Sequence, residues 1–129
     1  MLKNAKVAGR LPCQDLERAR RFYSEKLGLD PVEEREGGLR YVFPAGEFAL
    51  FETTGAPSGD HTQLAFDVED IEATVAELEA RGVSFEEYGG ITEVEGNYPS
   101  KGTGERGVWF RDSEGNVLGI GESTGGSGG

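Results

Sequence analysis

The sequence predicts an α+β fold built from two tandem β-α-β-β-β modules. The main observation is that one helical pattern occurs twice, over residues 15–29 and again over residues 70–83. Each copy opens with an aspartate that can accept hydrogen bonds from the first free amides of a helix, and a glycine suited to the left-handed residue after a helix stands near its end. Apolar side chains recur at helical spacing in both copies. Because strand patterns follow both helices in the same order, we predict a duplicated half-domain.

The first module is predicted to cover residues 4–53. Residues 4–12 form a strand pattern that ends at Pro12, which cannot donate to a central sheet ladder. The first helix follows this strand. Short turns then separate three more strand patterns, at residues 31–35, 39–43 and 47–52.

The second module, residues 61–122, repeats this order. A strand at residues 61–68 precedes the second helix, and three strands follow it at residues 84–88, 107–111 and 116–121. Residues 89–106 form an insert where the first module has a tight turn. Loops of this length in compact domains are usually functional or disordered. A ligand-contacting lid that includes Tyr98 and a solvent-exposed loop are both consistent with this pattern.

Two segments lie outside the modules. Residues 54–60, rich in glycine, proline and serine, are typical of a linker between the halves. Residues 123–129 consist of serine, threonine and glycine, which is the composition of a flexible tail added for expression. We therefore predict one domain over residues 1–122.

Composition and charge exclude several classes of function. The chain has 13 basic and 24 acidic residues, a net charge of −11, so it lacks the basic surface that general nucleic-acid binding needs. The acidity suits a soluble protein and mildly favours cationic ligands. No apolar run approaches the roughly 20 residues of a membrane span, and no signal peptide is visible. The single cysteine, Cys13, is interpreted as a small buried hydrophobe. We expect a cytoplasmic protein that binds neither nucleic acid nor membranes.

Three motifs together indicate a family. They are DLERARRFY at residues 15–23, LGL at residues 27–29 and FRDSEGN at residues 110–116. With the repeated modules, they resemble the vicinal oxygen chelate superfamily of glyoxalases, bleomycin-resistance proteins and extradiol dioxygenases, over residues 4–122. The resemblance implies that the two modules form a cupped mixed sheet with the helices outside. It also implies a homodimer, in which the modules pair either within one chain or between chains.

The resemblance places the family's metal ligands at four positions. Metal-binding members typically carry a histidine seven residues before each helix-capping aspartate and a glutamate on the last strand of a module. Those positions here hold Ala8, Gln63, Leu50 and Gly119. Alanine, leucine and glycine offer no side-chain donor, and glutamine is a weak neutral one. The sequence therefore predicts no metal cofactor at the usual site.

A displaced metal site is the alternative. Strand alternation places His61 on the face of Gln63 and Glu52 on the face of Leu50. Glu52, His61 and Gln63 would supply a carboxylate, an imidazole and an amide to a divalent metal, fewer good ligands than catalytic sites usually have. His61, the only histidine, is also the candidate general base if a reaction occurs. The other interpretation of His61 is a polar residue at the end of a strand.

Other side chains are assigned to the cup by alternation along their strands. Arg10 shares the face of Ala8 and could clamp a carboxylate or phosphate, or instead pair with an acidic neighbour such as Glu52. Phe48 is predicted to face the cup, as is either Trp109 or Phe110 but not both. The predicted ligand-binding residues are Arg10, Phe48, Glu52, His61, Gln63, Tyr98 and Trp109.

Three functions follow from these observations. The leading prediction is a metal-free protein that binds a small organic ligand, cationic or aromatic, like the drug-sequestering members of the superfamily. The alternative is a metal-dependent lyase or dioxygenase with a rearranged site, so enzymatic activity is left open. The third is an orphan or engineered scaffold without a ligand.

Overall fold

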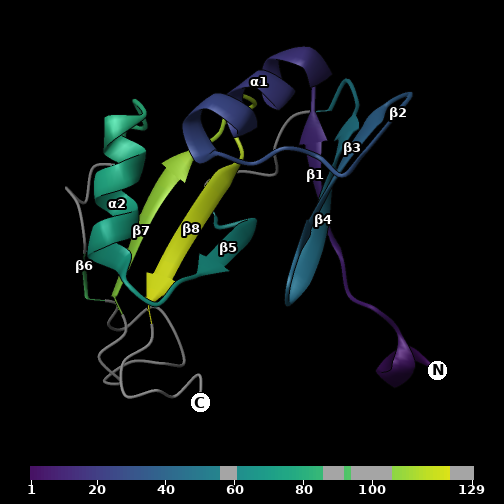
Figure 1. Ribbon diagram of the computed structural model, residues 1–129. Helices are drawn as coiled ribbons and strands as arrows, with labels where there is room; N and C mark the ends of the chain where they lie inside the picture. The colour runs from purple at the N-terminus through teal and green to yellow at the C-terminus, as the bar shows by residue number, and fades with distance from the viewer. Residues whose placement is uncertain (56–60, 86–91, 94–105, 123–129) are drawn as a thin grey trace. The chain divides into compact units, whose positions relative to one another are not determined.

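The computed structural model describes residues 1–55, 61–85, 92–93 and 106–122 (Figure 1). The chain divides into two compact units, of which the first comprises residues 1–59 and 112–116, and the second residues 60–111 and 117–129. Within the described residues, each unit holds one α-helix and one four-stranded mixed sheet. The predicted α+β fold of two β-α-β-β-β modules is confirmed.

The first unit follows the predicted order of elements. After a short 3-10 turn at Leu2–Asn4 come β1 (Gly9–Cys13), α1 (Leu16–Leu27), β2 (Glu33–Arg35), β3 (Gly38–Phe43) and β4 (Gly46–Glu52). The strand order in the sheet is β1-β4-β3-β2, with β1 parallel to β4 and the other neighbours antiparallel. The first strand therefore begins at Gly9, later than predicted.

Helix α1 begins and ends as its sequence predicts. The side chain of Asp15 accepts a hydrogen bond from the amide of Arg18 at 3.0 Å, which satisfies one of the free amides at the start of the helix. Gly28 ends the helix with a left-handed φ of 71°, and the amide of Leu29 then reaches back to the carbonyl of Tyr23 at 2.8 Å. These two signals fix the length of α1.

The core of the first unit lies between α1 and one face of its sheet. Tyr23 of α1 is buried, and its ring centroid lies 5.4 Å from that of Tyr41 and 5.8 Å from that of Phe48. Tyr41 and Phe48 stack on each other at 5.0 Å. Leu11 and Leu50 complete the same buried face. The opposite face of this sheet, which we call the open face, is not covered by α1.

Residues 112–116, the turn between the last two strands, belong to the first unit. The buried carboxylate of Glu114 accepts hydrogen bonds from the amides of Gln14 and Asp15 at 2.9 and 3.1 Å. It also accepts from the guanidinium of Arg18 at 2.8 and 2.9 Å. The hydroxyl of Tyr23 donates to Asp112 at 2.7 Å. This turn therefore anchors both the start and the middle of α1.

The second unit contains β5 (Leu64–Asp67), α2 (Ile71–Ala80), β6 (Thr92–Glu93), β7 (Arg106–Arg111) and β8 (Val117–Glu122). Its strand order, β5-β8-β7-β6, repeats that of the first unit. In the strand predicted at residues 84–88, Phe85 makes a single bridge to Phe110, and residues 86–88 lie outside the described part. The strand β6 lies within the predicted insert.

Helix α2 is capped in the same manner as α1. Asp70 accepts from the amide of Ala73 at 3.0 Å, and Gly82, with φ of 94°, lies just beyond the helix. The buried carboxylate of Glu122 accepts from the amide of Ile71 at 2.8 Å. A buried glutamate thus completes the start of each helix. No helix in the described part of the chain is long and apolar enough to cross a membrane.

The Glu114 cap generates a prediction about stability and pH. Burial alone would raise the pKa of this carboxyl, but the hydrogen bonds from Arg18, Ser113 and the amides of Asp15 and Gln14 outweigh it and hold the pKa at about 2, against an ordinary 4.5. The stabilisation is therefore complete above about pH 4.5 and is lost as the pH falls from there towards 2.

Glu114→Gln should lower the free energy of unfolding by about 3 kcal/mol at pH 7, because it leaves Arg18 without its buried partner. Urea unfolding at pH 7, 5 and 3 should show the difference from wild type shrinking at the lowest pH. The exposed Glu79→Gln on α2 is the control and should change stability by less than about 0.5 kcal/mol. A Glu114→Gln effect independent of pH would contradict this account.

Candidate functional site

The open face of the first sheet carries a cavity. Its volume is about 470 Å³, within the range of small-molecule sites. The residues around it include Ala8, Arg10, Arg40, Glu47, Ala49 and Phe51. All of the residues that line this cavity belong to the first unit. It is therefore defined by one sheet.

Two arginines flank an alanine in this cavity. Ala49 of β4 has Arg10 of β1 as its register partner on one side and Arg40 of β3 on the other. Neighbouring strands lie about 4.8 Å apart, so the backbones of the two arginines are roughly 10 Å apart with a small side chain between them. The register therefore places Arg10 and Arg40 on the same face of the sheet, on either side of Ala49.

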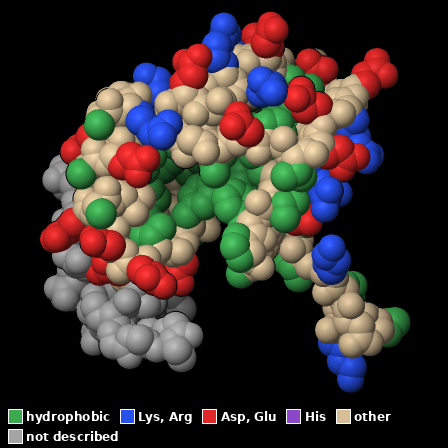
Figure 2. Space-filling model, viewed as in Figure 1, with side chains coloured by type: hydrophobic (Ala, Val, Ile, Leu, Met, Phe, Trp, Pro, Cys, Tyr) green, Lys and Arg blue, Asp and Glu red, His purple; other side chains and the backbone are tan. Residues whose placement is uncertain are grey.

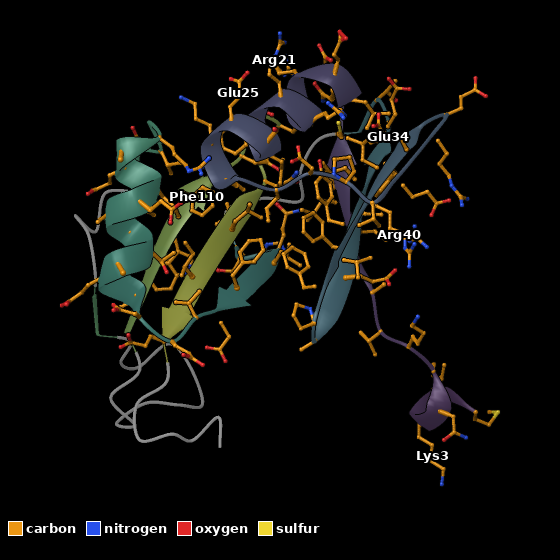
Figure 3. All side chains as sticks on the ribbon, viewed as in Figure 1. Lys3, Arg21, Glu25, Glu34, Arg40 and Phe110 are labelled. Atoms are coloured by element: carbon orange, nitrogen blue, oxygen red, sulfur yellow. The ribbon has the colours of Figure 1, made fainter. Side chains whose placement is uncertain are left out.

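Ion pairs hold Arg40 in place. Its guanidinium donates to Glu47 through two nitrogens, at 3.1 and 3.2 Å, and to Glu33 at 3.3 Å (Figure 3). The hydrogen bonds from Arg40 lower the pKa of Glu47, so this carboxyl is ionised at neutral pH. Because Glu33, Glu47 and Arg40 all line the cavity, these ion pairs lie on the open face.

Arg10 lies on the predicted face. It is exposed on the open face and lines the cavity, as alternation with Ala8 indicated. Within the described residues it makes no ion pair, so the alternative of a salt bridge with Glu52 is not observed. Its role in ligand binding stays a prediction.

The predicted direction of Phe48 is wrong. The side chain is only 2% exposed and stacks on Tyr41 beneath Tyr23 of α1. It therefore belongs to the hydrophobic core rather than to the open face. Its neighbours Ala49 and Phe51 occupy the open face instead.

The strand register also corrects one of the four mapped positions. Leu50 is the predicted first-module equivalent of Gly119. In the first unit Leu11, four residues before the capping Asp15, pairs with Leu50. In the second unit Phe66, four residues before Asp70, pairs with Ile120. Leu50 thus corresponds to Ile120, and the counterpart of Gly119 is Ala49. The correction leaves the chemistry unchanged, because alanine is no more a metal ligand than leucine.

Trp109 and Phe110 face opposite sides of the second sheet, as predicted. Phe110 is buried and makes an edge contact with Phe85 at 5.8 Å. Trp109 lies over Gly119, where an added Cβ would come within 3.2 Å of the indole nitrogen. That nitrogen donates to the hydroxyl of Thr62 at 2.9 Å. The indole thus occupies the space beside the position where metal-binding relatives carry a glutamate.

Of the remaining predicted site residues, Glu52 belongs to the first unit and His61 and Gln63 belong to the second. The amide oxygen of Gln63 accepts from the backbone of Val117 at 3.3 Å, which extends the pairing of β5 and β8. His61 is exposed just before β5, and Glu52 is exposed at the end of β4. Tyr98 lies outside the described residues. The roles of these residues in ligand binding, metal binding or catalysis stay predictions.

The donor set fits a metal ion poorly. Among the described residues, no three His, Cys, Asp or Glu side chains are grouped so that they could hold one. Gln63 is the only one of the four mapped positions with a donor atom, and its oxygen already accepts a backbone amide. Cys13 is buried, and burial together with the charge of Glu114 raises its thiol pKa to about 12, which suppresses the thiolate that binds metals.

Sequence reasoning missed the acidic residues of the cavity and the partner of the indole. Glu33 and Glu47 are not among the predicted site residues, yet both bind Arg40. Their signal was the opposite charge at cross-strand positions, since Glu33 is the register partner of Arg40. Thr62 carried no such signal, because its contact with Trp109 spans distant positions.

Comparisons with known proteins agree with this fold. A family model described as the Glyoxalase/Bleomycin resistance protein/Dioxygenase superfamily matches residues 6–120. A structure of a member of that superfamily from Sphaerobacter thermophilus shares 23% identity, covers 95% of this chain and 100% of its own, and has a TM-score of 0.73. A lactoylglutathione lyase from Agrobacterium tumefaciens shares 21% identity over 92% of this chain and 93% of its own, with a TM-score of 0.67. No curated protein sequence matches the chain.

The packing of Trp109 over Gly119 generates a testable prediction. Gly119→Glu should displace the indole, because even a Cβ at this position is tightly confined, and should cost about 3 kcal/mol through overpacking and a crowded carboxylate. Trp109 is the only tryptophan, so its emission reports on this site directly and should shift to the red.

Ala65→Glu is the matched control. Ala65 is the register partner of Gly119 on β5 and is exposed, so the same charge there should leave the emission and stability nearly unchanged. Equal emission spectra for wild type and Gly119→Glu would show that Trp109 does not occupy this position.

Proposed function

The chain belongs to the glyoxalase/bleomycin resistance protein/dioxygenase superfamily, and on that premise we propose that it binds a small organic ligand without the metal ion used by many members. The observation that carries the proposal is the chemistry of the four mapped positions. Read from the strand register, they are Ala8, Ala49, Gln63 and Gly119. Three have no side-chain donor, and Gln63 already accepts a backbone amide.

The indole at Gly119 supports the same proposal. A ligand carboxylate inserted at that position would compete with Trp109 for the same space. An aromatic ring beside a sheet is instead a surface on which an organic ligand can pack. A metal-binding carboxylate at position 119 would therefore require Trp109 to move as well.

The cavity on the open face supports the binding of an organic ligand. Its size suits a small molecule, and Ala49 and Phe51 contribute apolar surface beside the charged arginines. Phe51 is 38% exposed, which is a large accessible area for a phenyl ring. Apolar surface with a few polar anchors is the usual composition of ligand sites.

The net charge of the chain does not determine whether the ligand is cationic or anionic. The net charge of −11 favours cations at long range, yet acidic and basic side chains are interspersed on the visible surface (Figure 2). Interactions between exposed charges more than about 8 Å apart are largely screened at physiological ionic strength. Local groups at the site therefore decide the preference. Homodimerisation stays a prediction from the family resemblance.

A thermal-shift screen in the presence of a chelator tests the proposal. A ligand that binds the native state at 100 times its Kd adds about 2.7 kcal/mol of stability, which should raise the Tm by several degrees. The shift should persist in His61→Ala, because the proposal assigns no metal to that side chain.

The competing enzyme hypothesis predicts a different pattern. Ligand-induced shifts would then require added divalent metal and would disappear in His61→Ala or Glu52→Ala. Chelators would also abolish turnover of hemithioacetals or catechols. That result would contradict metal-free binding.

A further inference from the structure

We propose that the cavity on the open face of the first sheet binds the carboxylate of an apolar or aromatic organic acid, with Arg10 as the anchoring residue. The inference rests on the proposed function and specifies the ligand class for it. It starts from a difference between the two arginines that flank Ala49. Arg40 is paired with Glu33 and Glu47, whereas Arg10 makes no ion pair with any described residue.

The ion pairs of Arg40 leave Arg10 as the arginine that can bind an anion. Its three guanidinium nitrogens already donate to carboxylates, so its position is fixed from two strands. Arg10 stands opposite it across Ala49, and its guanidinium makes no ion pair with any residue that the structure describes. A guanidinium can present two parallel N–H groups to one carboxylate, and this geometry is stronger and more specific than a single hydrogen bond.

Charges around Arg10 favour an anion at this end of the cavity. Three cations act on the carboxylate of Glu47: Arg40, Lys6 and Arg10. Three arginines and three glutamates line the cavity, so their charges balance, although the chain as a whole is acidic. Arg35 and Arg40 pair with Glu33 and Glu47, whereas Arg10 makes no ion pair with a described residue. At the other end Arg35 pairs with Glu33, and Glu36 is exposed at the turn before β3.

The floor of the cavity suits the rest of an organic acid. Ala49 has a small side chain between the two arginines, and Phe51 lies two residues further along the same face of β4. A carboxylate at Arg10 would leave an attached ring or chain free to pack on this surface. A cationic group in the same place would meet the positive charge of Arg10 and be repelled.

Titration of the intact chain with three matched probes tests the assignment. The probes are 3-phenylpropionate, its neutral amide and 3-phenylpropylamine, which differ mainly in the charge of the head group. Backbone amide shifts in NMR spectra give both the affinity and the location. The acid should bind about tenfold more tightly than the amide, should shift Arg10 and Ala49, and should weaken as salt is added.

Variants distinguish a specific contact between Arg10 and the carboxylate from a general effect of positive charge. Arg10→Gln should reduce the affinity for the acid to about that of the amide while leaving the amide unaffected, and Arg10→Lys should give an intermediate value. Arg21→Gln is the control, because this exposed arginine on α1 has no contact with the cavity (Figure 3). Arg10 is exposed, so its variants should keep the wild-type unfolding curve.

Several results would overturn the assignment. They are equal binding of acid and amide, tightest binding of the amine, shifts located only outside the cavity, an unchanged affinity in Arg10→Gln, or no binding of any probe. Inorganic phosphate binding more tightly than the acid would replace the carboxylate by a phosphate group. These outcomes leave metal-free binding of another organic ligand intact, whereas acid binding that requires added metal would overturn the proposed function itself.

Discussion

The buried carboxylate of Glu114 is the interaction on which the first unit depends. It accepts two backbone amides at the start of α1 and the guanidinium of Arg18, so it ties the start of the helix to the turn at residues 112–116. The position of α1 in turn places Tyr23 over one face of the sheet. That face becomes the core, and the opposite face, which carries Arg10, is not covered by α1. The site thus follows from which face the helix covers.

The helices were predictable because their ends are encoded locally. Asp15 and Asp70 cap as their spacing indicates, and Gly28 and Gly82 adopt left-handed conformations where the chain leaves each helix. The contacts of Glu114 were not predictable in the same way, since nearly 100 residues separate it from the amides it accepts. Pairing over such distances has no periodic signal in one sequence.

The prediction of which β4 side chains lie on the open face was wrong for an identifiable reason. The choice of Leu50 as the first-module counterpart of Gly119 assumes that the turns before the last strands of the two modules have equal length. The register shows instead that residues 44–45 connect β3 to β4, whereas residues 112–116 connect β7 to β8. A one-residue offset in a strand moves every side chain to the other face. Phe48 therefore lies in the core and Ala49 on the open face. Alternation alone did predict that Trp109 and Phe110 face opposite sides of their sheet.

The central claim is that this chain holds a ligand without the metal typical of many relatives. Elemental analysis tests it most directly, on protein purified without chelator or metal-affinity column and again after dialysis against Mn, Ni, Zn and Fe(II). The account predicts a metal content well below one ion per chain in every sample, because Ala8, Ala49 and Gly119 supply no ligands. One stoichiometric ion that is lost in His61→Ala would contradict it.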